Sequence, residues 1–260
     1  SIYIIKMKIF TISHKRPDFL ELQLKTFKKH LKEFEFIVFN NATFDLDKKH
    51  YNEIHQWCKN NNIKCVDIQK DNDLIKKIKN IDNTTNIFKG DGTYADPGVA
   101  CAYPLEYGWE KVISKYNEKI CIIDSDMFFV KDFEFNGELA FVPQSKENDV
   151  LYMWNGIIFA DLSKISKDIS FWCGKVLNTP VDVGGQSYFY LKRNQHLNIQ
   201  HLIPTHITED STCNFYPPNY EYIALNNEYI ILHHRGGSNW NNMTKDYLDK
   251  KTAWLKNKLL

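Results

Sequence analysis

The sequence lacks the long apolar runs and the excess of charge that mark two large classes of protein. No stretch of its 260 residues approaches the roughly 18 uninterrupted apolar residues of a membrane-spanning helix. The net charge at neutral pH is only +1, which gives no electrostatic reason to expect nucleic acid as a partner. The opening residues, SIYIIKMKIF, are interrupted by lysines and lack a small-residue cleavage site, so they are not typical of a signal peptide.

Closely spaced cysteine pairs are also missing. The six cysteines are scattered, and none forms a C-x-x-C pair. Several lie in apolar surroundings, which favours reduced thiols in the core. We therefore expect a reducing compartment and a cytoplasmic protein. Hydrophobic residues make up 43% of the chain and aromatic residues 14%, which is typical of a globular protein with a substantial core.

The first half of the chain alternates between strand and helix patterns. Strands are predicted over residues 7–13, 35–40 and 63–68, and amphipathic helices over 16–34 and 48–61. Such alternation predicts parallel β-α-β units and an α/β fold. From Asp71 to Asp96 the periodicity fades into a polar, turn-rich segment, which we expect to be a mobile loop that orders over a bound ligand. A helix is predicted next, despite Pro104, over residues 98–116.

The second half has no internal repeat and no hinge-like linker, so the sequence predicts one α/β domain over residues 1–260. Apolar strand patterns cover residues 138–143, 151–162, 199–204 and 228–234. Helices are predicted at about 163–177 and at the C-terminus, over 243–260. The C-terminal helix is basic and amphipathic, so it either packs its apolar residues on the domain or lies on a membrane surface. The second alternative would make the protein cytoplasmic but membrane-associated.

The segment EKICIIDSDMFFV, residues 118–130, places two aspartates after a short apolar run. The run is typical of a buried strand, and in open α/β sheets ligands bind at the carboxyl ends of strands. Alternation along an extended backbone would put Asp124 and Asp126 on one side, with Ser125 turned away. Two hard oxygen ligands on one side suit Mg²⁺ or Mn²⁺. The alternative is a strand end that simply emerges into solvent.

Three later segments add polar groups next to apolar runs. WNG places Asn155 and Gly156 at the head of an apolar run, where glycine allows a ligand close to the backbone and asparagine offers a donor and an acceptor. DVGGQ combines Asp182 with two glycines and Gln186. HHRGGSNW ends a strand on two histidines, of which His234 begins the motif considered below.

Together these motifs resemble, in order and approximate spacing, those of the GT-A glycosyltransferases. The nearest likeness is to the retaining group that includes glycogenin and the lipopolysaccharide galactosyltransferases. The matching motifs are D-S-D at 124–126, W-N-G at 154–156, D-V-G-G-Q at 182–186 and H-R-G-G-S-N-W at 234–240. The resemblance implies a single GT-A domain, Rossmann-like, with a mostly parallel mixed sheet flanked by helices. In such a domain residues 1–130 would form the nucleotide-binding half, 131–242 the donor and acceptor half, and 243–260 the C-terminal helix.

The resemblance also implies an activity and the residues that carry it. The chain would transfer a sugar from a nucleoside-diphosphate sugar, with UDP the expected base, to a hydroxyl of a glycan or glycoconjugate acceptor. Mn²⁺ or Mg²⁺ would be held by the side chains of Asp124, Asp126 and His234. The expected nucleotide-sugar contacts are Thr11, Ser13, Asn40, Lys89, Asp124, Asn155 and Gly156. Because Ser238 stands where the family has a phosphate-binding lysine, phosphate contact would pass to Lys89, Arg235 or a backbone nest.

Asp182 and Gln186 are the expected catalytic residues, and the stereochemistry stays open between inversion and retention. In an inverting enzyme Asp182 would deprotonate the acceptor hydroxyl. A purely structural role, capping the helix that follows, is the alternative.

Other functions fit parts of the same pattern. A phosphotransferase of the haloacid dehalogenase type also has D-x-D after a buried strand, although that family usually has it near the N-terminus. A nucleotidyltransferase would need a Gly-Ser pair before the aspartates, and none is present. A non-catalytic sugar-nucleotide-binding module is the third alternative.

Overall fold

The N-terminal half folds as the periodicity predicts, with strands and helices in alternation. The computed structural model describes residues 6–43, 45–83, 86–206, 220–234 and 245–260. The elements up to the aspartate motif are β1 (Met7–Ser13), α1 (Pro17–His30), β2 (Phe34–Asn40), α2 (Lys48–Asn60), β3 (Lys64–Asp67), α3 (Asn72–Ile81), α4 (Pro97–Lys111), η1 (Ile113–Lys115) and β4 (Lys119–Ile123). Pro17 opens α1, where its missing N–H costs no hydrogen bond.

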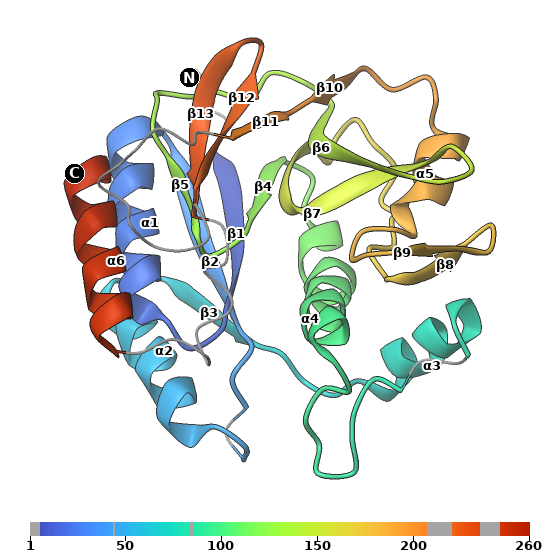
Figure 1. The fold of residues 1–260 in the computed structure, drawn as a ribbon, viewed down its shortest axis with the longest axis horizontal. Coiled ribbons are helices and arrows are strands. Elements are labelled where there is room, and N and C mark those ends of the chain that lie inside the picture. The colour runs from blue at the N-terminus through green and yellow to red at the C-terminus, as the bar shows by residue number, and fades with distance from the viewer. Residues whose placement is uncertain (1–5, 44, 84–85, 207–219, 235–244) are drawn as a thin grey trace.

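The second half is richer in strands. Its elements are β5 (Met127–Phe129), β6 (Leu139–Lys146), β7 (Val150–Asp161), β8 (Gly174–Val176), β9 (Thr179–Val181), α5 (Ser187–Arg193), β10 (Ile199–His201), β11 (Ile203–His206), β12 (Glu221–Leu225), β13 (Glu228–His233) and α6 (Lys245–Leu259). The strands gather in a large sheet, a smaller antiparallel sheet and the β8–β9 hairpin (Figure 1).

The large sheet has seven strands in the order β10-β6-β7-β4-β1-β2-β3 and is mostly parallel. Only β7 runs antiparallel to its two neighbours, β4 and β6. The chain proceeds from β1 to β2 and β3 on one side, and then adds β4 on the other side of β1. This reversal makes the carboxyl ends of β1 and β4 the topological switch point, where α/β sheets bind ligands.

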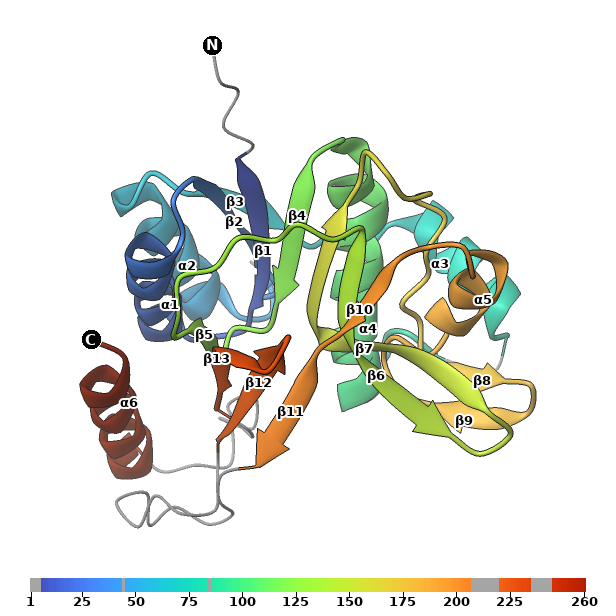
Figure 2. The same ribbon diagram turned by 90° about the horizontal axis from the view of Figure 1, so that it is seen from above.

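Helices cover both faces of this sheet, which confirms the predicted α/β class. Buried residues of α1 and α2, such as Phe27 and Ile54, pack with one face. Buried residues of α3, α4 and α5, such as Leu74, Trp109 and Tyr190, pack with the other. Figure 2 shows the sheet edge-on between the two groups of helices.

The smaller sheet has the order β11-β12-β13-β5 and lies beside α1. Because β5 follows β4 by a turn of three residues, the aspartate motif is the link between the two sheets. Sequence analysis did not predict this second sheet, since it joins strands far apart in the chain.

The C-terminal helix packs against the domain. Leu255 is 0% and Leu259 4% exposed, in a cluster with Phe19 and Leu22 of α1. The helix also hydrogen-bonds α1, since Lys29 Nζ donates to the Leu259 carbonyl oxygen at 3.2 Å. These contacts favour the packing alternative over the membrane-surface one. None of the described helices is long and apolar enough to cross a bilayer.

Two local predictions were wrong. Residues 163–173 form turns and irregular chain, followed by β8, where a helix was expected. The segment from Asp71 to Asp96 was expected to be a loop, but its first part is α3, capped by the Asp71 carboxylate, which accepts from Leu74 N. In the part of the chain that the structure describes, all five cysteines are free thiols.

Candidate active site

The D-S-D motif is a turn and not an extended strand. β4 ends at Ile123, β5 begins at Met127, and Met127 N donates to the Asp124 carbonyl oxygen at 3.1 Å. The alternation argument for the two carboxylates therefore does not apply. The turn is instead fixed by buried Gln23 of α1, whose Nε2 donates to the carbonyl oxygens of Asp124 at 2.8 Å and Met127 at 3.1 Å. No motif in the sequence points to Gln23.

Both aspartates are shielded from water. Asp126 is only 6% exposed, and Asp124 is half-buried. Burial and the nearby carboxylate of Asp126 raise the pKa of Asp124 well above its ordinary value. A solvated strand end would not bury Asp126 in this way. Two neighbouring carboxylates with little access to water need a compensating positive charge to be ionised together.

His233 is the third polar side chain at the D-S-D turn, after Asp124 and Asp126. Its Nε2 lies 3.6 Å from Asp126 Oδ1, and its Nδ1 lies 2.7 Å from Oε1 of buried Glu221. Burial alone would lower the pKa of His233, but the carboxylates of Asp126 and Glu221 raise it overall. The predicted ligand His234 follows His233 in the chain, and its backbone N–H donates to the Asp126 carbonyl oxygen at 2.8 Å. Its imidazole is 0% exposed and lies edge-on to the Trp254 ring, with 6.1 Å between the ring centroids.

Asp126 and His233 are spaced as two ligands of one divalent cation would be. Asp126 Oδ1 and His233 Nε2 are too far apart for a good hydrogen bond. Two ligand atoms that are each about 2.1 Å from one ion lie roughly 3 Å or more apart, which matches their separation. Glu221 completes a carboxylate–histidine pair of the kind that orients metal-binding imidazoles. Glu221, too, was missed in the sequence.

The W-N-G and D-V-G-G-Q motifs meet beside this turn. Gly156 O accepts from Asp124 N at 2.8 Å, and the Trp154 ring lies 5.4 Å from the His233 ring. Gly184 has φ +95°, and a Cβ there would lie 2.0 Å from the Met153 carbonyl oxygen. The glycine therefore lets the 182–186 turn dock on β7 immediately before Asn155.

The two predicted catalytic residues have different environments. Asp182 is exposed, with 72% of its side chain accessible, and its carboxylate lies 3.4 Å from Lys146 Nζ. Gln186 is buried, and its Nε2 donates to the Lys175 carbonyl oxygen at 3.0 Å. The contacts of Gln186 thus hold the turn to β8, whereas Asp182 is accessible to a substrate.

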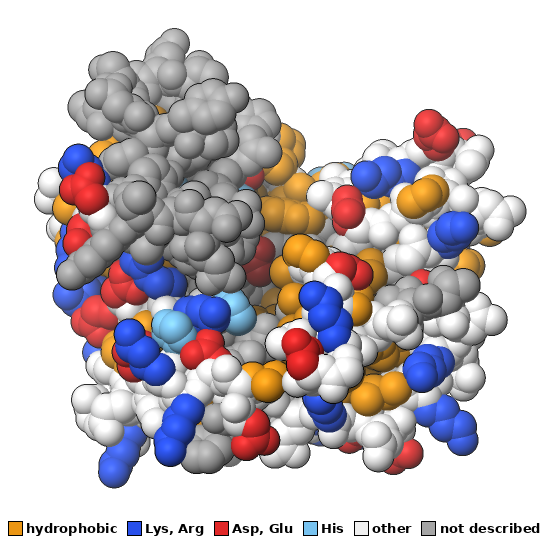
Figure 3. Space-filling model, turned by 60° about the horizontal axis from the view of Figure 1, so that its bottom comes forward, with side chains coloured by type: hydrophobic (Ala, Val, Ile, Leu, Met, Phe, Trp, Pro, Cys, Tyr) orange, Lys and Arg blue, Asp and Glu red, His pale blue; other side chains and the backbone are white. Residues whose placement is uncertain are grey.

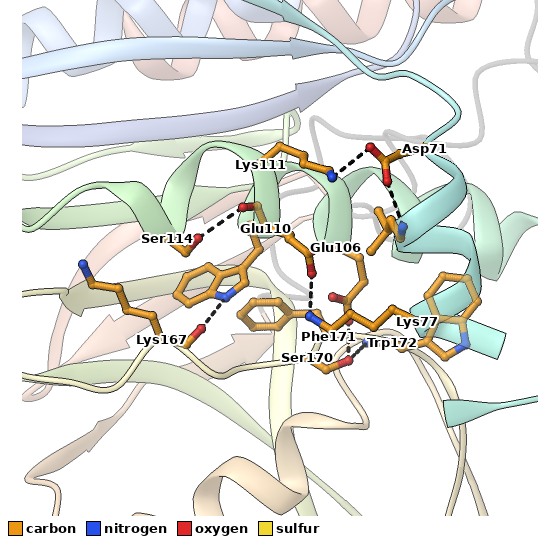
Figure 4. A network of polar contacts seen from close by, with 12 residues as sticks. Asp71, Lys77, Glu106, Glu110, Lys111, Ser114, Lys167, Ser170, Phe171 and Trp172 are labelled. Atoms are coloured by element: carbon orange, nitrogen blue, oxygen red, sulfur yellow. Dashed lines mark hydrogen bonds and ion pairs between the residues drawn. The ribbon is translucent and has the colours of Figure 1, made fainter. Parts of the chain in front are cut away.

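A buried carboxyl group, that of Glu106, supports the 182–186 turn through the segment before β8 (Figure 4). Glu106 of α4 points at the segment before β8, where Oε1 accepts from Phe171 N at 2.5 Å and from the Ser170 hydroxyl. Phe171 O then accepts from Gly184 N at 2.7 Å. Burial raises the pKa of Glu106 to about 7, although the hydrogen bonds from Ser170 and Phe171 oppose the rise. Glu106 is a positioning residue that the sequence did not single out.

The three residues predicted to frame the nucleotide lie at the carboxyl ends of β1 and β2. The Thr11 hydroxyl donates to the Ile123 carbonyl oxygen. Asn40 is buried and holds its own loop, accepting from Ala42 N at 3.1 Å. Ser13 is also buried, and its Oγ has no hydrogen-bond partner among the described residues. Buried hydroxyl groups normally have a hydrogen-bond partner, so a ligand at the switch point could supply the partner of Ser13.

Of the other predicted residues, one is exposed in a loop and the rest lie outside the described residues. Lys89 is exposed in a tight loop, closed by the bridge between Phe88 and Tyr94. Residues 235–240 of the last motif, with Arg235, lie outside the described residues. Figure 3 shows a face of the molecule that is hollowed, with hydrophobic and acidic side chains in the depression.

Comparison with known proteins finds similar folds but no sequence relative. No protein-family model matches the chain, and no curated protein matches its sequence. Among solved structures, the apo glycosyltransferase GlyE of Streptococcus pneumoniae TIGR4 is similar over 75% of this chain and 45% of its own, with 12% identity and a TM-score of 0.38. Mouse xyloside xylosyltransferase 1 is similar over 74% and 84% of the two chains, with 9% identity and a TM-score of 0.41.

A third similar structure is the mannosyltransferase PcManGT from Pyrobaculum calidifontis in complex with GDP-Man and Mn²⁺. It is similar over 76% of this chain and 55% of its own, with 8% identity and a TM-score of 0.39. The chain spans less than half the length of the first similar structures, namely 33% of the bifunctional glycosyltransferase WbbM and 45% of GlyE. By their names, all of these similar structures are glycosyltransferases.

Proposed function

We propose that this chain is a metal-dependent glycosyltransferase. It would move a sugar from a nucleoside-diphosphate sugar, with UDP the first base to test, to a hydroxyl group of a glycan or glycoconjugate. The observation that carries the proposal is the buried set of Asp126, His233 and Glu221 beside Asp124, at the switch point of an α/β sheet. The order of the four sequence motifs supports the same activity.

The ion would be held by Asp124, Asp126 and His233, with Glu221 keeping the imidazole in place. When bound, a divalent ion at these residues neutralises charge on the diphosphate leaving group. Around it, Ser13 offers a buried hydroxyl to the nucleotide, and Asn155 is the proposed contact for the donor sugar. The burial or partial burial of these side chains next to the turn supports the assignments.

Asp182 is the proposed catalytic carboxylate because it is accessible and lies in the turn docked beside Asn155. In the reaction, a bond forms between the acceptor oxygen and the anomeric carbon, and the bond from that carbon to the diphosphate breaks. The acceptor loses a proton in this step. Asp182 would take that proton in an inverting reaction or orient the acceptor in a retaining one. Gln186 would act on this turn by holding it to β8.

The test is a thermal-shift panel of nucleoside diphosphates, with and without Mn²⁺. A ligand that binds only the folded state raises the melting temperature through a stabilisation of RT ln(1 + [L]/Kd). We expect one diphosphate to stabilise the protein only when Mn²⁺ is present. His233→Ala should abolish that shift, whereas His234→Ala, if it is folded by circular dichroism, should keep it.

The alternatives give different results in the same panel. A haloacid dehalogenase-type phosphotransferase would be stabilised by phosphate monoesters with Mg²⁺ and would release phosphate from them. A non-catalytic module would bind the nucleotide sugar and leave it intact with every acceptor tried. Stabilisation by a diphosphate that is independent of metal would contradict the role given to His233.

A further inference from the structure

A second cluster of metal-binding side chain types lies at the edge of the large sheet, apart from the aspartate turn. It consists of His55 on α2 and of Cys65 and Asp67 on β3. Their ligand atoms all lie within 4.8 Å of one another. Alternation along β3 puts Cys65 and Asp67 on the same face of the strand. The cluster therefore combines a helix and an edge strand, and it plays no part in the proposed transfer reaction.

The carboxylate of this cluster is held in a fixed orientation. The Tyr51 hydroxyl donates to Asp67 Oδ2 at 2.7 Å, and Asp67 Oδ1 lies 2.7 Å from His55 Nε2. The Tyr51 and His55 rings are 4.5 Å apart between centroids. Supporting hydrogen bonds of this kind orient the ligands of metal sites in proteins. The side chains of His55 and Asp67 are 35% and 29% exposed, so an ion can enter from solvent.

From this geometry we propose that His55, Cys65 and Asp67 form a binding site for a zinc-type divalent cation. One nitrogen, one sulfur and one carboxylate oxygen are the ligand types that Zn²⁺ takes, with water at the fourth position. The thiolate disfavours Mg²⁺, Ca²⁺ and Mn²⁺, which prefer oxygen. This site is therefore chemically distinct from the one at Asp124 and Asp126. The ion would tie α2 to β3, next to Asn40, which pairs with Asp67 in the sheet.

A catalytic Cys–His–Asp triad fits these residues less well. In such a triad the imidazole must contact the thiol, because it takes the proton of the nucleophile. His55 is engaged by Asp67 and has no hydrogen bond to Cys65 among those described. The rival interpretation is an ion pair between His55 and Asp67 without a metal. It does not involve Cys65, so the experiment must report on the Cys65 thiol.

Cobalt(II) is the probe because thiolate-bound Co²⁺ has a charge-transfer absorption band that oxygen and nitrogen ligands do not give. We expect the full-length protein to show this band at a 1:1 ratio and to lose it on addition of Zn²⁺. Cys65→Ser should abolish the band, and His55→Gln should weaken Co²⁺ binding at least tenfold. Cys101→Ser, which changes an exposed cysteine, and Asp126→Asn, which changes the other proposed site, are the controls and should keep it.

Either of two results would overturn the proposal. One is the absence of a thiolate band in the wild-type protein with excess Co²⁺. The other is a band that survives Cys65→Ser. If Cys65→Ser does not fold, the His55→Gln variant provides the test. If that variant binds Co²⁺ as tightly as the wild type does, the proposed site is excluded. Because Asp126→Asn removes only the aspartate-turn site, a failure here is distinguishable from a failure of the proposed transferase function.

Discussion

Replacing Glu106 by glutamine should remove a pH dependence from the stability of the protein. Glu106 is 3% exposed, and burial raises its pKa from an ordinary value of 4.5 to about 7. The folded state therefore holds this proton more tightly than the unfolded chain does. The stabilisation is complete below pH 4.5 and is lost as the pH rises through about 7.

The size of the effect follows from the difference in pKa between the two states. At about 1.4 kcal/mol for each pH unit of difference, the rise corresponds to about 3 kcal/mol of stability lost between pH 4.5 and pH 8. A carboxamide cannot ionise but can accept from Phe171 N as the carboxyl group does. The Glu106→Gln variant should therefore lack this loss and become the more stable protein, relative to the wild type, as the pH rises.

Urea unfolding followed by circular dichroism, at several pH values between 4.5 and 8, measures this difference. Glu110→Gln is the matched control, because it removes a carboxylate four residues along the same helix that pairs with Lys77 at the surface. We expect that control to keep the wild-type pH profile. Parallel stability curves for the wild type and Glu106→Gln would refute the reasoning from burial.

Three further predictions concern the glycine turn, the C-terminal helix and the reactivity of Cys101. Gly184→Ala should lose at least about 2 kcal/mol in urea unfolding, because a Cβ would meet Met153 O at 2.0 Å at a positive φ; wild-type stability would show that the turn can move. Leu255→Ala should cost about 2–5 kcal/mol, since the side chain is 0% exposed, and the wild-type protein should not co-sediment with anionic liposomes; salt-sensitive co-sedimentation would restore the membrane alternative. Cys101 is exposed as a residue, but its thiol lies among neighbouring groups that desolvate it, and together with the Asp124 and Asp126 carboxylates they raise its pKa to about 11. It should react more slowly with maleimide when Mn²⁺ and UDP cover it, and equal rates followed by mass spectrometry would argue against a ligand there.

Most elements of the fold could be predicted because their periodicity is local. The pattern over residues 7–13 gave β1 with the correct bounds, and the patterns that follow it gave α1 to β3 to within a few residues. The helix expected at about 163–177 failed for a reason that lies elsewhere in the chain. Glu106 of α4 accepts hydrogen bonds from Ser170 and Phe171, and these contacts hold that segment in an irregular conformation.

Which of the two adjacent histidines pairs with a buried carboxylate could not be predicted from the sequence. A β-bulge determines that it is His233. The β12–β13 hairpin starts with Leu225 opposite Glu228, and the register shifts between Ile223 and Ala224. The shift puts Glu221 opposite His233, where the carboxylate and the imidazole form their hydrogen bond. Long-range pairing of this kind leaves no trace in residue spacing.

The most direct test of the central proposal is the release of a nucleoside diphosphate from nucleotide sugars. Wild-type protein, Mn²⁺ and a panel of UDP-, GDP- and other nucleotide sugars are incubated with water or simple glycans as acceptors, and free diphosphate is measured. We predict release from at least one donor in the wild type, and its loss with a chelator or in a folded Asp126→Asn variant. Release that persists in Asp126→Asn at the wild-type rate, or no release and no binding of any donor, would contradict the proposal.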